Sequence, residues 1–128
     1  MTLHEKQMEN FRAAVKFQNS IRAKAKRRFD KIFSAEDLNG LTAKSDYSGI
    51  CFEKINRFNN WSCWYFINPV FNSDRTKAVD LFFKSQSEDY PEMPQFISDK
   101  KQQILDIFTE LINLHTVGEL ELEKNELK

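Results

Sequence analysis

Residues 3–33 contain neither glycine nor proline, and no other feature restricts the possible folds of this chain as strongly. Only 3 glycines and 3 prolines occur in all 128 residues, which leaves little room for an all-β sandwich with many turns. At about 100° per residue, the apolar side chains of this stretch gather on one side of a helix. They are Phe11, Ala14, Val15, Ile21, Ala25, Phe29, Ile32 and Phe33. The stretch therefore predicts one long amphipathic helix, and Asn39-Gly40 is expected to end the helical region.

The pattern changes after residue 48, where β-branched and aromatic residues become frequent. Residues 49–56 and 61–68 favour two strands, and the intervening Arg-Phe-Asn-Asn favours a turn. Pro69 is expected to end the second strand. Residues 77–84 then predict a third strand, whereas the polar stretch 42–48 is expected to be a connector. Together these segments predict a three-stranded antiparallel meander.

A second helix is expected to begin near Asp99, with Ser98 as its capping residue. Its apolar residues form a wide face that needs burial: Ile104, Leu105, Ile107, Phe108, Leu111, Ile112 and Leu114. Gly118 is expected to end this helix, and residues 119–128 are an acidic tail that would either fray or add a short strand. The chain, residues 1–128, is thus predicted to be a single compact α+β domain with a long N-terminal helix, a three-stranded antiparallel meander and a second helix packed on the sheet.

Basic side chains are concentrated in the first predicted helix. The 19 basic and 19 acidic residues of the chain cancel, which excludes a uniformly basic protein that coats DNA. Residues 12–31 nevertheless hold eight basic residues and one acidic residue. The candidate binding residues on one side of this helix are Arg12, Lys16, Lys24, Arg27 and Lys31. Such a face can lie along phosphates, dock on an acidic protein or stay solvated.

Aromatic residues are expected on both faces of the second strand. Side chains alternate along a strand, so Trp61 and Tyr65 fall on one face, and Trp64 and Phe66 fall on the other. Two helices readily cover one face of a three-stranded sheet, so either they sandwich the sheet or one aromatic face is left for a partner. Trp61, Trp64 and Tyr65 are therefore candidate partner-binding residues, with burial in the core and stacking on bases as the alternatives.

The residues that could carry catalysis are few. With a two-residue turn at Asn59-Asn60, Cys51 lies opposite Asn68 and far from Cys63, so both are expected to be free thiols. The sequence contains no phosphate-binding glycine loop and no hydrolase motif. We therefore expect that the chain is not an enzyme and that it holds no cofactor and no metal. The remote alternative is an enzyme in which His115 activates the thiol of Cys51 or Cys63 as a nucleophile.

The N-terminus is polar without a signal-peptide core, and no apolar run approaches the about 20 residues that span a bilayer. These features predict a cytoplasmic protein without a membrane partner.

The leading hypothesis is a small non-enzymatic inhibitor or adaptor, of the general kind of immunity or anti-defence proteins, that occludes an acidic or nucleic-acid-handling protein. The alternative is a nucleic-acid-binding module that lays the first helix along phosphates. The segregated charge would also let copies of the chain associate as a homodimer.

Overall fold

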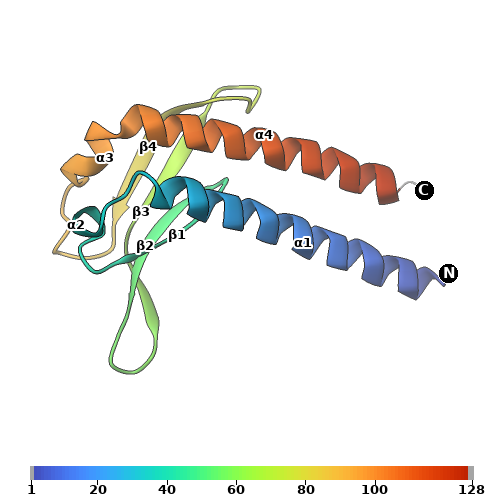
Figure 1. Ribbon diagram of the computed structural model, residues 1–128, viewed down its shortest axis with the longest axis horizontal. Coiled ribbons are helices and arrows are strands. Elements are labelled where there is room, and N and C mark those ends of the chain that lie inside the picture. Colours follow the sequence, from blue (N-terminus) through green and yellow to red (C-terminus); the bar gives the residue numbers. More distant parts are fainter. Residues whose placement is uncertain (1, 127–128) are drawn as a thin grey trace.

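The computed structural model describes residues 2–126, with side chains to Lys124, and forms one layer of helices packed against one sheet (Figure 1). The elements in chain order are α1 (Leu3–Asp30), α2 (Ala35–Leu38), β1 (Thr42–Asp46), β2 (Gly49–Ile55), β3 (Trp61–Phe71), β4 (Ala78–Ser85), α3 (Gln95–Asp99) and α4 (Lys101–Glu126). The strands are antiparallel in the order β1-β2-β3-β4, and α1 and α4 lie side by side against one face of the sheet (Figure 1). The predicted α+β class, with a long N-terminal helix and an antiparallel sheet, is confirmed.

The prediction of three strands is wrong, because the polar stretch 42–46 forms a fourth strand at the edge of the sheet. β1 pairs with β2 from Thr42↔Glu53 to Asp46↔Gly49. Asp46 closes the hairpin, since its carboxylate accepts hydrogen bonds from the Ser48 amide at 2.7 Å and from the Ser48 hydroxyl. An edge strand with one solvated face can be polar, because backbone pairing rather than apolar alternation holds it in place.

The first helix ends at Asp30, three residues before the predicted end. The chain then turns, and Ser34 and Asp37 form a capping box that starts the short helix α2. Asn39 adopts the left-handed conformation and Gly40 has a φ of +82°, so the dipeptide ends the helical region as predicted. The half-buried Lys100 ties this corner to the start of α4, because its ammonium group donates to the Ile32 carbonyl and to the Asp37 carboxylate, each at 2.5 Å.

The β2–β3 hairpin has a longer turn than the sequence suggested. The last pair is Ile55↔Trp61, so five residues form the loop rather than two. The Asn56 side chain organises this loop by accepting hydrogen bonds from the amides of Phe58 and Asn60. β3 also continues past Pro69 to Phe71. No residue of β2 pairs with Pro69, so at this position β3 has a neighbouring strand only on the β4 side. The missing amide hydrogen of proline is tolerated where a strand has only one neighbour.

A β-bulge at Trp64 changes which residues share a face of β3. The pairing steps from Phe52↔Tyr65 to Glu53↔Cys63, which leaves Trp64 without a partner across the strand. As a result, Trp64 and Tyr65 both contact the ring of Tyr90 on the helix-covered side. Side chains of β3 therefore alternate between the two faces of the sheet before the bulge and again after it, but the alternation does not continue across the bulge.

The core lies between the helix pair and the sheet. Its largest fully buried side chains are Phe29, Ile50, Phe52, Tyr65, Ile67, Ile97, Ile104, Phe108, Leu111 and Ile112. The rings of Phe52 and Tyr65 stack with centroids 4.4 Å apart, and Phe29 packs against Phe108 at 5.3 Å. All buried residues of α1 lie in its C-terminal half, and those of α4 extend no further than His115. The opposite halves of the two helices therefore extend beyond the sheet as a pair (Figure 1).

Gly118 does not end the second long helix, as the sequence had suggested. α4 continues through it to Glu126, so residues 119–126 are helical; residues 127–128 of the predicted tail lie outside the described residues. Gly118 instead faces α1, where a Cβ atom would lie 2.0 Å from Cε2 of Phe17. The glycine is a close-approach position between the two helices.

Candidate functional site

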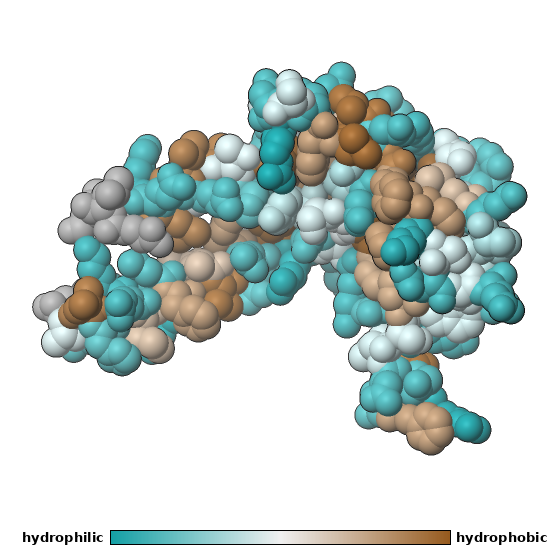
Figure 2. All heavy atoms as spheres, turned by 180° about the vertical axis from the view of Figure 1, so that it is seen from behind, coloured by the Kyte–Doolittle hydropathy of each residue, from teal (hydrophilic) through white to brown (hydrophobic). Residues whose placement is uncertain are grey.

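Among the described residues 2–126, no helix covers one face of the sheet, and aromatic side chains project from it. We call this surface the open face and define it by Trp61, Phe66, Val70 and Phe82. Phe82 is 52% exposed and Trp61 is 49% exposed, whereas Phe66 is half-buried between them. Figure 2 views the molecule from this side and shows hydrophobic side chains gathered over the sheet. A face of this kind is typical of an interaction surface.

Two lysines lie beside aromatic side chains of the open face. The Lys44 ammonium lies 4.5 Å from the centroid of the Trp61 ring and 2.7 Å from the Glu53 carboxylate, which is mostly buried. Lys84 lies directly opposite Phe66 on the neighbouring strand and is exposed. Trp61 therefore has a cation–π contact with Lys44 at the border of the open face.

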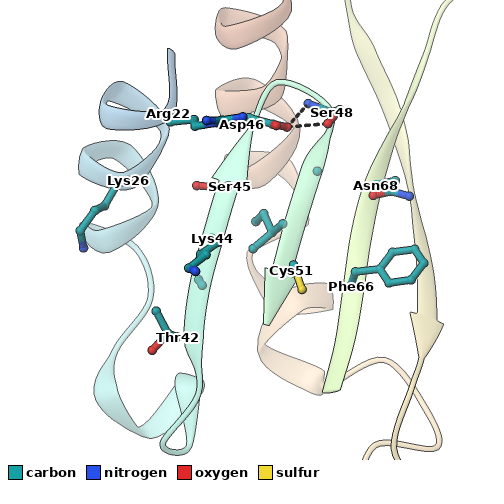
Figure 3. A pocket seen from close by; sticks show the side chains of 13 residues that line it. Arg22, Lys26, Thr42, Lys44, Ser45, Asp46, Ser48, Cys51, Phe66 and Asn68 are labelled. Atoms are coloured by element: carbon teal, nitrogen blue, oxygen red, sulfur yellow. Dashed lines mark hydrogen bonds between the residues drawn. The ribbon is translucent and has the colours of Figure 1, made fainter. Parts of the chain in front are cut away.

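The open face continues around strand β1 into a hollow of about 740 Å³. All five residues of β1 line it, together with Cys51 and Phe66 from the sheet and Arg22 and Lys26 from α1 (Figure 3). In Figure 3 Arg22 reaches from α1 toward Asp46. Three carboxylates accompany these cations, because Lys26 pairs with Asp30 at 2.8 Å, Lys44 pairs with Glu53 and Asp46 lies beside Arg22. We call this border of the open face, with charges of both signs, the charged edge.

The cysteines lie on the open face and are both free, as predicted. Their predicted separation is wrong, because the five-residue turn shifts the β2–β3 register and places Cys63 opposite Glu53, diagonally across from Cys51 on the same face. Burial and then hydrogen bonding with the Cys63 thiol raise the pKa of Cys51 to about 12, so this thiol stays protonated at neutral pH. A protonated thiol is a poor nucleophile. His115 lies on α4, on the other side of the sheet, where it stacks on Tyr47 with ring centroids 3.7 Å apart.

Within residues 2–124 no group of three histidine, cysteine or acidic side chains is placed to hold a metal ion. The described helices also include none with the length and apolar character required to cross a membrane.

The predicted basic residues of α1 fall into two groups. Lys24 is bound to Glu110 of α4 at 3.0 Å, and Arg28 binds the same carboxylate at 3.0 Å. The hydrogen bond from Lys24 and the charge of Arg28 lower the pKa of Glu110 below its ordinary value, so this cluster joins the two helices. The other group is exposed and points away from the sheet: Arg12, Lys16, Arg27 and Lys31. The structure does not bring this second group together with the aromatic residues of the open face.

Of the three predicted aromatic binding residues, Trp61 alone lies on the open face. Tyr65 is fully buried against Phe52, which removes it from the surface and corrects the prediction that it contacts a partner. Trp64 is half-buried against Tyr90 at the edge of the core. The bulge is the physical reason, because it moves Tyr65 to the side opposite Trp61.

Sequence reasoning missed Phe66, Phe82 and Arg22 as members of this surface. Phe82 follows Leu81 in β4, so strand alternation alone placed it on the face opposite the core. That signal was present in the sequence. Arg22 had no comparable signal, because its place beside β1 depends on a strand that the composition of residues 42–46 does not suggest.

No protein-family model, no curated protein and no solved structure matches this chain. The function is therefore inferred from the geometry of the open face and the charged edge.

Proposed function

We propose that this chain is a non-enzymatic protein-binding module of the inhibitor or adaptor type, which occludes its partner with the open face. The observation that carries the proposal is that Trp61 and Phe82 are both half-exposed on a sheet face that none of the described helices covers. Aromatic side chains are enriched where protein interfaces are most tightly packed, because they bury a large area at a small cost in conformational entropy.

The charges around the open face define the chemistry of the partner. Arg22, Lys26 and Lys44 line the hollow at the charged edge together with Asp46, and Lys84 is exposed beside Phe66. A partner surface with an apolar centre and a rim that carries charges of both signs complements this arrangement. Opposite charges at the rim speed the encounter, whereas the aromatic contacts at the centre slow dissociation.

Substitutions on the open face test this proposal. The partner is first captured from an extract of the cells that make this chain, then purified and titrated by calorimetry. Trp61→Ala and Phe82→Ser are each expected to weaken its binding about 30-fold or more, because they remove packing from the centre of the interface. Leu3→Ser is the matched control, since Leu3 is exposed at the far end of α1 and should leave the affinity unchanged. Equal affinity of all three variants and the unaltered chain would refute the proposal.

A second candidate function is nucleic-acid binding by the exposed side of α1. Within the described part of the chain, Arg12, Lys16, Arg27 and Lys31 take part in no ion pair, so their charges are available to phosphates. Four phosphate contacts would weaken binding about 100-fold between about 50 and 200 mM salt.

Titration of labelled single- and double-stranded DNA and RNA separates the two functions. The protein-binding proposal expects no tight complex at low salt. A tight complex that loses about 100-fold in affinity at the higher salt, and that the reversal of all four charges abolishes, would assign nucleic-acid binding to α1 instead.

A further inference from the structure

The β2–β3 hairpin projects from the body of the protein. Figures 1 and 2 show its closed end extending away from the helices and from the rest of the sheet. We call residues 54–62 the finger, and every one of them is exposed. Because the finger is narrow and convex, a partner that contacts it on more than one side has to be concave there.

Apolar side chains gather toward the end of the finger. Phe58 lies in the loop and is 68% exposed, more than any other aromatic side chain among the described residues. Ile55 and Trp61 pair across the two strands just behind the loop, and both are exposed. Side chains of this kind lose most contact with water when they enter a pocket, which is where the residues that dominate binding energies are found.

The charges of the finger are all positive. Lys54 and Arg57 are the only ionisable residues between positions 54 and 62, and in the described part of the chain neither forms an ion pair. The guanidinium carbon of Arg57 lies 4.8 Å from the centroid of the Phe58 ring, so a pocket that takes the ring also receives the cation. A cation that leaves water needs a carboxylate as its partner, and arginine binds one with two parallel hydrogen bonds.

Asn56 holds the loop of the finger in one conformation. Its side-chain oxygen accepts hydrogen bonds from the amides of Phe58 and Asn60, its carbonyl accepts one from the Asn59 amide at 3.0 Å, and its own amide donates to the Asn60 carbonyl at 2.9 Å. Asn59 completes the turn in the left-handed conformation. The loop is therefore ordered before binding, which reduces the entropic cost of an interface.

We propose that the finger inserts into an apolar pocket with an acidic rim on the partner protein, and that Phe58 fills this pocket. The inference rests on the proposed function and adds a second contact region beside the open face. A protein pocket fits the finger better than a lipid surface does, because the side-chain amides of Asn59 and Asn60 require hydrogen-bonding partners that hydrocarbon lacks.

Calorimetric titration of the purified partner with variants of the full chain tests the proposal. Phe58→Ala is expected to weaken binding about 30-fold or more, and Arg57→Glu about 10-fold or more. Phe11→Ala is the control for the ring, since Phe11 on α1 is 63% exposed. Arg75→Glu is the control for the charge, since Arg75 is exposed in the β3–β4 turn, 5.6 Å from the Phe71 ring. Both controls should bind as the unaltered chain does, and circular dichroism of each variant confirms that the fold is kept.

Photo-cross-linking tests the chemistry of the pocket. A benzophenone-bearing analogue of phenylalanine in place of Phe58 is expected to cross-link to the partner, at a segment that contains aspartate or glutamate. The same analogue in place of Ser73, which is exposed in the β3–β4 turn, should give no cross-link. A cross-linked segment without an acidic residue would contradict the acidic rim.

The results separate this inference from the proposed function. If Phe82→Ser weakens binding and the two finger variants do not, the open face binds the partner without the finger, and only the inference is overturned. If none of these variants changes the affinity, both are overturned. If Phe58→Ala and Arg57→Glu instead abolish a complex with the labelled DNA or RNA, the finger contacts nucleic acid, and a protein pocket for it is excluded.

Discussion

Replacing Gly118 by alanine is expected to destabilise the protein by about 1–2 kcal/mol, although alanine is normally the better helix former. In an unconstrained helix interior the same change would stabilise by up to about 1 kcal/mol. Here the added Cβ would lie 2.0 Å from Cε2 of Phe17, so the ring would have to leave its stack on His115 or the helices would have to separate. Overpacking of this kind costs about 1–3 kcal/mol.

The Phe17→Ala background provides the control for this prediction. Without the ring, the Gly118→Ala change should become stabilising, because only its helix propensity remains. Urea denaturation of the four proteins in this double-mutant cycle measures the reversal of sign. A stabilising effect of Gly118→Ala in the presence of Phe17 would show that the helices do not approach as closely as described.

Replacing Lys100 by methionine is expected to cost about 1–2 kcal/mol of stability at neutral pH. The change removes both hydrogen bonds of the Lys100 ammonium and leaves the mostly buried Asp37 carboxylate without its cation. Lys100 lowers the pKa of Asp37 below 3.8, so the ion pair stabilises the fold above that pH. As the pH falls below 3.8 and Asp37 becomes protonated, the difference between the two proteins should narrow.

The neighbouring Lys101 supplies a matched control for the Lys100 prediction. Its ion pair with Asp80 is exposed on both sides, with exposed side-chain fractions of 48% and 59%. Exposed pairs contribute little, so Lys101→Met should change the stability much less than Lys100→Met does. Thermal or urea unfolding between about pH 2 and 7 compares the two variants. Equal losses for both lysines would contradict a structural role for the Lys100 corner.

The long-range periodic features of the fold were predictable from the sequence, and the local irregularities were not. The apolar repeat of α1 and the aromatic strands identified an α+β architecture, because burial of one face imposes those periods. The β1 strand escaped prediction, since its residues carry no apolar alternation and its place depends on pairing with β2. Gly118 was misjudged for a related reason: glycine ends helices frequently, but here it serves the contact with Phe17 on a distant helix.

The candidate site was predicted in part, and one bulge explains the difference. Strand alternation correctly indicated that aromatic residues would occupy both faces of β3. The extra residue at Trp64 then placed Trp61 on the open face and Tyr65 in the core, a change that no pattern within the strand signals. The basic side of α1 was correctly placed on the helix surface, but its residues divide between binding Glu110 and facing solvent according to where α4 lies.

The pairing of α1 with α4 also has a consequence for how the chain folds. The sheet is a simple meander, so each strand finds its neighbour nearby in the sequence. The bond between Arg28 and Glu110, in contrast, joins residues 82 positions apart. Closing so long a loop is entropically costly and slow, so the hairpins can form early whereas the helix contact forms late. During synthesis on the ribosome, Ile21, Ala25 and Phe29 would therefore stay without their α4 cover until residues 104–112 have emerged. That interval is when a chaperone would be most needed.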